Sequence, residues 1–180
     1  MRRLILIATI WLAAVSLLQP LHAFADPADS ALSQDNLTII SRTCVAAQGQ
    51  LARVQINDKL VRINRGGSYS SLLKLMNSFN SRAASNNYDV SPLVPLSSSL
   101  SDKYQQFVGD FTKYDNSMDN VVQMNCQNQP AVFYSALTQT RGLRVQLAGD
   151  IKDMDQVVDQ YQQAVVQFRA TVVSREGSTQ

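Results

Sequence analysis

Histidine, tryptophan and glutamate are almost absent from this chain of 180 residues. The only histidine is His22, the only tryptophan is Trp11, and the only glutamate is Glu176, near the C-terminus. After residue 22 the chain therefore cannot form a Ser-His or Cys-His catalytic pair, or a zinc site with a histidine ligand. Acid–base catalysis would rest on aspartate, lysine, tyrosine or serine alone. The composition argues against an enzyme, and we expect no metal and no cofactor.

The first 25 residues have the three parts of a secretory signal peptide. Arg2 and Arg3 supply the positive start, residues 4–18 form an apolar run, and residues 23–25 provide the small-x-small pattern of a cleavage site. The apolar run is about 15 residues long, short of the roughly 20 that span a bilayer. We predict cleavage after residue 25 and a secreted, periplasmic or cell-envelope protein. The alternative is an uncleaved segment that anchors the chain in a membrane.

An excess of one charge is also missing. The chain carries 16 lysines and arginines against 14 aspartates and glutamates, a net charge of +2. Arg2 and Arg3 leave with the predicted signal peptide, so the remaining chain is neutral. Electrostatics therefore favour neither nucleic acid nor an anionic membrane as a partner. We expect a protein partner or self-association.

Two cysteines remain in the predicted exported chain, Cys44 and Cys126. In an exported protein such a pair most often forms a structural disulfide, and we predict that bond here. The alternative is a pair of buried free thiols. The bond would also restrict the topology, because it needs the two Cα atoms within about 7 Å of each other.

Apolar residues recur every three or four positions over three long segments, a spacing typical of helices packed side by side in a bundle or coiled coil. No segment alternates with the period of two that marks a half-buried strand. The sequence therefore predicts an all-α domain. The three series include Leu37, Ile40, Cys44, Ala47, Leu51 and Val54; Leu100, Tyr104, Phe107, Phe111, Tyr114, Met118 and Val121; and Leu143, Leu147, Ile151, Met154, Val158, Tyr161, Val165 and Phe168.

Turn-forming residues divide the chain into elements. Asp29 or Ser30 can cap a first helix, which Gly66 and Gly67 interrupt, and Ser68 can cap its continuation. Pro-rich and Asn-rich sequence marks the next connection. The predicted elements are a helix over 29–85, an extended connection over 86–96, and helices over 97–126 and 130–174.

The predicted disulfide distinguishes two topologies. If Gly66 and Gly67 formed a hairpin, the two cysteines would lie roughly 45 Å apart. If the glycines form only a kink, Cys44 can lie beside Cys126. We therefore predict an elongated, coiled-coil-like antiparallel three-helix bundle about 65 Å long, whose first helix is broken at the glycine pair. Residues 26–174 would form one domain and residues 175–180 a flexible tail.

In this topology residues 26–43 project past the turn at Cys126 and carry apolar side chains without intramolecular partners. Such side chains favour a contact surface for self-association or for another protein. The alternative is that the segment folds back onto the end of the bundle. The candidate contact residues are Leu32, Leu37, Ile39 and Ile40.

A weak candidate for an anion site is formed by Arg62, Arg65, Gly66, Gly67 and Ser68. Backbone N–H groups at a helix start can hold a phosphate or carboxylate, and two arginines would strengthen that contact. A glycine stop followed by a serine cap explains the same residues without a ligand. The Gly-Lys-Ser/Thr ending of a P-loop is missing, so nucleotide binding is not indicated.

The aspartates of the last two predicted helices fall outside the heptad core positions. They lack the glycine and glutamate spacing of a calcium-binding loop. We therefore expect them to form solvated helix faces. They are Asp110, Asp115, Asp119, Asp150, Asp153, Asp155 and Asp159.

Together these features predict an exported helical rod without catalytic activity. Its expected role is that of a structural or protein-interaction module of the cell envelope or extracellular space. The alternative function is a carrier that holds a small apolar ligand between its helices, where bundles commonly place ligand pockets.

Overall fold

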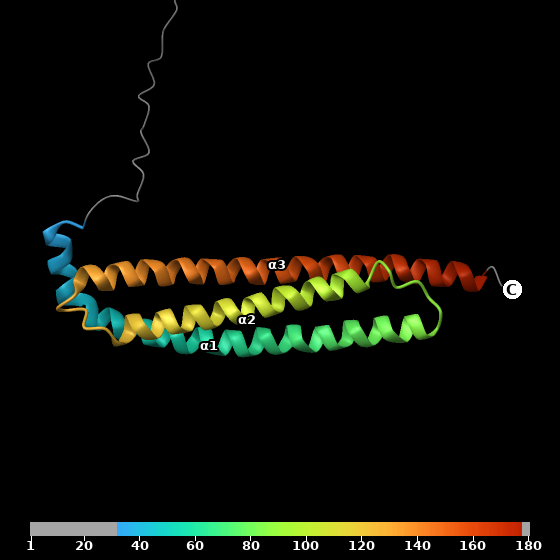
Figure 1. Ribbon diagram of the computed structural model, residues 1–180, viewed down its shortest axis with the longest axis horizontal. Helices are drawn as coiled ribbons and strands as arrows, with labels where there is room; N and C mark the ends of the chain where they lie inside the picture. The colour runs from blue at the N-terminus through green and yellow to red at the C-terminus, as the bar shows by residue number, and fades with distance from the viewer. Residues whose placement is uncertain (1–31, 178–180) are drawn as a thin grey trace, which may run out of the picture. The chain divides into compact units, whose positions relative to one another are not determined.

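A computed structural model describes residues 32–177, which belong to one compact unit. They form three α-helices: α1 (Gln34–Ser85), α2 (Val94–Gln123) and α3 (Pro130–Gly177). The helices lie lengthwise against one another (Figure 1), and no strand occurs among the described residues. The prediction of an all-helical fold with three packed helices is confirmed. The predicted signal peptide lies outside the described residues.

Both ends of α1 are set by local sequence. Ser33 is its N-cap, because the Ser33 Oγ accepts a hydrogen bond from the Asn36 N–H at 3.2 Å. The helix thus begins at Gln34, and the predicted caps Asp29 and Ser30 lie outside the described residues. Its C-terminal end is followed by Asn87, whose φ of 59° lies in the left-handed region that stops a helix.

The connection between α1 and α2 is shorter than predicted. α2 begins at Val94, inside the expected 86–96 connection, with Pro95 in its first turn, where a proline breaks no helical hydrogen bond. α2 ends at Gln123, before the predicted end at residue 126. α3 begins at Pro130, as predicted, and continues to Gly177, past the predicted end at residue 174.

The predicted break at Gly66 and Gly67 is wrong, because α1 runs through both residues. No glycine in the described part of the chain has a positive φ. Ser68, expected to cap a new helix, donates its hydroxyl to the Asn64 carbonyl inside the helix at 3.0 Å. Gly66 is buried where a Cβ would meet the Tyr104 hydroxyl oxygen of α2 at 3.8 Å. Glycine costs a helix up to about 1 kcal/mol, and side-chain packing on either side of the pair outweighs that cost.

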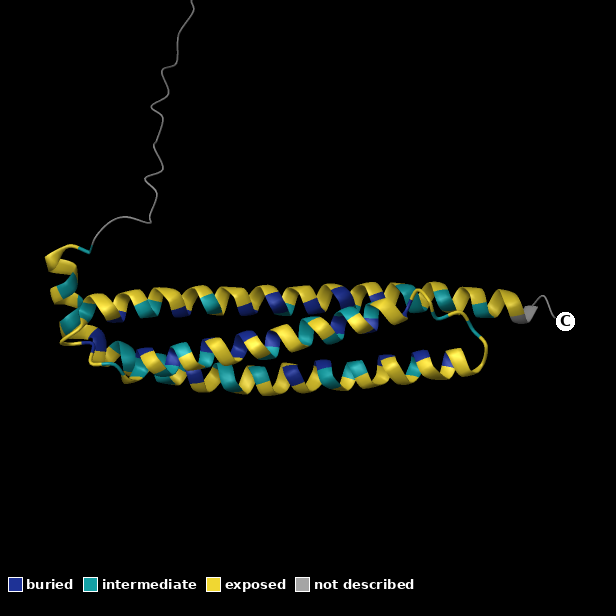
Figure 2. Ribbon diagram, viewed as in Figure 1, coloured by how far each residue is buried: buried dark blue, intermediate teal, exposed yellow. Residues whose placement is uncertain are grey.

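The core is centred on α2, because α1 and α3 each pack more extensively on α2 than on each other. Buried residues, dark blue in Figure 2, lie on the helix faces that point toward one another. On α2 these include Phe107, Phe111 and Tyr114, none more than 7% exposed. Neighbouring rings in this series lie 5.9 to 6.4 Å apart between centroids, the spacing of favourable aromatic pairs.

Polar contacts between helices show which residues lie opposite one another. Residues with increasing numbers in α1 contact residues with decreasing numbers in α2. The same residues of α1 contact residues with increasing numbers in α3. The contacts between α1 and α2 join Gln48 to Val121, Gln55 to Asp115 and Asn80 to Ser97. Those between α1 and α3 join Asp58 to Arg144, Tyr69 to Asp155 and Asn80 to Tyr161.

A disulfide joins Cys44 of α1 to Cys126 in the α2–α3 loop, with 5.9 Å between the Cα atoms. This is the pair that the sequence predicts. Both cysteines are buried in a small second cluster with Val121 and Phe133. The bond closes a loop whose ends are 82 residues apart.

The first turns of α1 curve toward the start of α3 (Figure 1). Ile40 packs against the disulfide cluster, and the Ser41 hydroxyl donates to the Gln127 carbonyl at 2.7 Å. Ile40 and Ser41 thus contact the end of the bundle rather than projecting past it, and Ile40 is partly buried there. Of the other candidate contact residues, Leu32 and Leu37 are half-buried and Ile39 is 59% exposed.

Replacing both cysteines, Cys44→Ala with Cys126→Ala, should lower the free energy of unfolding by about 4 kcal/mol, because an unbridged loop of this length gains entropy on unfolding. The measurement is urea unfolding followed by far-UV circular dichroism, on protein purified after expression of the full chain. Treating the parent protein with a reductant is the control and should give nearly the same loss. An unchanged unfolding midpoint would show that the pair is not bonded.

Gly66→Ala should raise the free energy of unfolding by roughly 0.5–1 kcal/mol, because alanine favours a continuous helix and its Cβ would make only ordinary contact with Tyr104. Gly109→Ala is the matched control, since nothing lies within 4 Å of a Cβ at that position in α2. Both variants are compared by the same urea titration. Destabilisation by Gly66→Ala alone would mean that α1 does break at the glycine pair.

Candidate functional site

A polar layer with two buried aspartates lies between α2 and α3, where two Gln-x-x-x-Asp segments face each other. Gln106 Nε2 donates to Asp150 Oδ1 at 3.1 Å, and Gln146 Nε2 donates to Asp110 Oδ2 at 2.6 Å. Lys113 adds a hydrogen bond to Asp110 Oδ1 at 2.7 Å. The reciprocal contacts are met only when α2 and α3 are aligned in this one way, so the layer fixes their relative position along the helix axes.

The two aspartates of this layer differ in electrostatics. Asp110 is 5% exposed and Asp150 7% exposed, so the prediction that the aspartates form solvated faces is wrong for this pair. The hydrogen bond from Lys113 lowers the pKa of Asp110 below its ordinary value. Burial, followed by the charges of Asp110 and Asp153, raises the pKa of Asp150, whose Oδ2 has no hydrogen-bond partner among the described residues.

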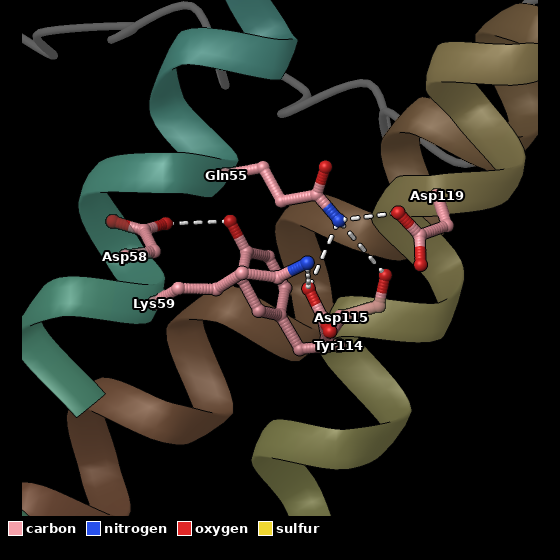
Figure 3. Close-up of polar contacts among 6 residues, drawn as sticks. All are labelled: Gln55, Asp58, Lys59, Tyr114, Asp115 and Asp119. Atoms are coloured by element: carbon pink, nitrogen blue, oxygen red, sulfur yellow. Dashed lines mark hydrogen bonds and ion pairs between the residues drawn. The ribbon is translucent and has the colours of Figure 1, made fainter. Parts of the chain in front are cut away.

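A second polar cluster joins α1 to α2. Figure 3 shows the buried side chain of Gln55 pointing from α1 toward Asp115 and Asp119. Its Nε2 donates to the Oδ1 of Asp115 at 2.9 Å and to that of Asp119 at 2.6 Å. Lys59 Nζ forms an ion pair with Asp115 at 3.0 Å. Unlike Asp110 and Asp150, these two carboxylates are only partly buried.

A groove of about 510 Å³ lies between α1 and α3, with α2 behind it. This volume falls within the roughly 300–1,000 Å³ of small-molecule sites. Phe107, Phe111 and Tyr114 of α2 form its floor. The walls are formed by Asp58, Val61 and Arg62 of α1 and by Arg141, Arg144, Val145, Leu147, Ala148 and Ile151 of α3. Its lining is mainly apolar, with charged groups from both walls.

One of the charged groups of this groove is fully compensated. Arg144 donates to both carboxylate oxygens of Asp58, at 2.8 Å from Nε and 3.0 Å from Nη2. The Tyr114 hydroxyl donates to Oδ2 of Asp58, as Figure 3 shows. Burial alone would raise the pKa of Asp58, but the hydrogen bonds from Arg144 and Tyr114 lower it. Burial together with Asp58 raises the pKa of Tyr114, so this phenol stays protonated.

Two further cations of the groove have no carboxylate partner. The Arg62 guanidinium carbon lies 5.4 Å from the centroid of the Phe111 ring, a cation–π contact. Within residues 32–177, neither Arg62 nor Arg141 forms an ion pair or a hydrogen bond. With Arg144 matched by Asp58, the groove keeps an excess of two positive charges.

The structure does not bring the predicted anion-site residues together. Only Arg62 lines the groove, whereas Arg65 Nη1 lies 3.7 Å from Asp155 Oδ2. Gly66, Gly67 and Ser68 lie inside a continuous helix, so no helix start offers free N–H groups there. The helix-start contact that this prediction needed is therefore absent from α1 at this point.

The outward face of α1 carries an apolar stripe that the sequence reasoning missed. Its four large residues, Val45, Ile56, Leu60 and Ile63, are between 56% and 61% exposed. A Cβ added at Gly49 or Gly67 would meet nothing within 4 Å. The signal was present in the sequence as a second series with steps of three and four. This α1 stripe comprises Val45, Gly49, Ala52, Ile56, Leu60, Ile63 and Gly67.

Residues 32–177 contain neither a cluster of metal-binding side chains nor a helix able to span a membrane. No three histidine, cysteine, aspartate or glutamate side chains there are grouped so as to hold a metal ion. No helix of that part carries an apolar stretch long enough to cross a bilayer. Neither a protein-family model, nor a curated protein, nor a solved structure matches the chain.

Asp150→Asn should raise the free energy of unfolding at pH 7 by about 1 kcal/mol, because it removes a buried charge and keeps an oxygen that can accept from Gln106. Since folding raises the pKa of Asp150, the charged form destabilises the fold above that pKa. The advantage of the variant should therefore shrink as the pH falls toward the unfolded value of about 3.9.

Urea unfolding at pH 7 and pH 4 checks this expectation, with Asp159→Asn, on an exposed position of α3, as the control. Equal stabilities of the Asp150→Asn and Asp159→Asn variants at pH 7 would show that the charge of Asp150 does not destabilise the fold. A loss of stability in Asp150→Asn would show that the carboxylate is needed in its charged form.

Proposed function

We propose that this protein is an exported helical rod without catalytic activity, an elongated antiparallel three-helix bundle with coiled-coil-like packing. It serves as a structural or protein-interaction module of the cell envelope or extracellular space. The Cys44–Cys126 bond supports export, because such bonds persist in oxidising compartments. The observation that carries the interaction role is the α1 stripe, a long apolar helix face whose four large side chains are more than half exposed in the described chain.

The occupant that this stripe fits best is a second copy of the chain, running in the opposite direction. The stripe positions are symmetric about Ile56, which would meet itself on a two-fold axis. In each of the remaining three pairings a large side chain of one copy meets a small residue of the other, as knobs-into-holes packing requires. The pairs are Val45 with Gly67, Gly49 with Ile63, and Ala52 with Leu60.

A parallel arrangement of the same stripe fits poorly. It would place Gly49 on Gly49, which leaves a gap, and Ile63 on Ile63, which crowds the contact. Core-like contacts lose stability from cavities and from overpacking alike. The order of large and small residues therefore favours the antiparallel pairing.

The size of the α1 stripe sets the expected affinity. Its 23 residues extend about 33 Å along α1. A contact of that length between two helices buries on the order of 1,000 Å² over both copies, at the lower end of specific interfaces. An interface of this size suits a dimer that dissociates reversibly rather than a permanent one.

Ile56→Lys should raise the dissociation constant of the dimer by at least about 100-fold, because it buries two unpaired charges at the two-fold axis. Sedimentation equilibrium of protein purified after expression of the full chain gives this constant. Val166→Lys is the control, since Val166 of α3 is equally exposed but lies outside the stripe. A monomeric parent protein at the highest attainable concentration would contradict the proposal, as would equal effects of the two variants.

A pair of substitutions tests the direction of packing. Gly49→Ile should weaken the dimer by crowding Ile63 of the second copy, and adding Ile63→Ala should restore it. In a parallel dimer positions 49 and 63 do not meet, so the second substitution would weaken association further. Rescue therefore supports the antiparallel pairing, and additive loss overturns it.

A further inference from the structure

We propose that the groove between α1 and α3 binds one fatty-acid carboxylate, with the alkyl chain over the aromatic floor and the anionic group at Arg62, while Arg141 adds to the positive charge of the groove. This goes beyond the interaction role of the rod. It gives the carrier function, the alternative drawn from the sequence, a defined site and a ligand class. It does not depend on self-association, because none of the residues that line the groove belongs to the α1 stripe.

The apolar part of the groove matches an alkyl chain. Phe107 and Phe111 provide aromatic faces at its floor, and Val61 and Val145 stand at its walls. Val145 is 73% exposed and Val61 48% exposed, so these side chains remain uncovered in the chain alone. Burial of such apolar surface stabilises a complex by roughly 25 cal/mol for each Å² removed from water.

The charges of the groove select an anionic head group. Asp58 is satisfied by Arg144 and Tyr114 and cannot also compensate the other cations. Arg62 and Arg141 therefore present two guanidinium groups with free donors, and guanidinium binds a carboxylate through paired hydrogen bonds. A neutral lipid would bury apolar surface but leave both cations without a counter-charge.

The dimensions of the groove favour a single small molecule over a docked helix. Its lining on α3 extends from Arg141 to Ile151, a length of about 15 Å. A helix docked in a groove makes contact through anchors spaced over several turns, whereas a volume of about 510 Å³ is that of a small-molecule site. Arg62, stacked on Phe111, stands where the apolar floor meets the charged wall, as an amphiphile requires.

Isothermal titration calorimetry with decanoate and with neutral 1-decanol tests the proposal on protein purified after expression of the full chain. We expect one decanoate per chain and much weaker binding of decanol. The double variant Arg62→Gln with Arg141→Gln should weaken decanoate binding by about 10- to 100-fold, the effect of losing hydrogen bonds to a charged group. Its affinity for decanol should stay nearly unchanged.

The matched control is Arg42→Gln with Arg53→Gln, which removes the same charge from exposed positions of α1 outside the groove. This variant should bind decanoate as the parent does, with an unchanged far-UV circular dichroism spectrum for both double variants. Equal weakening of decanoate binding by the two double variants would show that the effect comes from the overall charge of the protein, and would overturn the proposed site. Failure of the parent to bind decanoate would overturn it directly.

Ala148→Trp fills the groove and should abolish the binding of decanoate and of decanol. Undiminished binding by this variant would place the ligand elsewhere and overturn the proposal. A change of oligomeric state caused by Ala148→Trp, but not by Ile56→Lys, would show that a second copy occupies the groove, which also overturns it. Loss of the dimer in Ile56→Lys with decanoate binding retained would separate the two proposals.

Discussion

The aromatic face of α2 is the contact on which the arrangement of all three helices depends. Phe107, Phe111 and Tyr114 are buried, and both long helices pack on them rather than mainly on each other. With apolar burial worth about 1.5–3 kcal/mol for each large side chain, these rings are the strongest cohesion in the middle of the fold. Because α1 and α3 meet over α2 without closing on each other, the same rings that hold the helices together also floor the groove.

The helices could be predicted because their apolar residues recur every three or four positions, which matches the period of an α-helix and not that of a strand. The continuity of α1 could not, because a glycine pair is ambiguous in local sequence. Gly66 and Gly67 resemble a helix stop, but the outcome depends on whether Leu72 and Met76 beyond them reach the same core as Leu51 before them, and they do. The curved start of α1 could not be predicted for a related reason: Ile40 is partly buried only by the cluster around the disulfide, which residues far along the chain complete.

The candidate sites were less predictable than the fold, because each depends on the distance between helices. Asp110 and Asp150 each lie one residue before a member of the apolar series, and only the close approach of α2 to α3 buries them. The groove needs the opposite condition, a wide gap between α1 and α3, and no spacing of residues in one helix encodes it. The α1 stripe differs, because its residues also recur every three or four positions, and such a second series on one helix does not by itself show which face packs on the core.

The position of the disulfide has a mechanical consequence. A pulling force applied between the start of α1 and the end of α3 would cross from one helix to the other at the Cys44–Cys126 bond. Residues 45–125, with the whole of α2, would carry none of that tension. Because the bond closes this loop, pulling on the two ends cannot extend its residues, which would span on the order of 280 Å as a fully extended chain. Under load this protein would behave as α3 joined covalently to the first turns of α1, while the surfaces between them stay folded and out of the line of force.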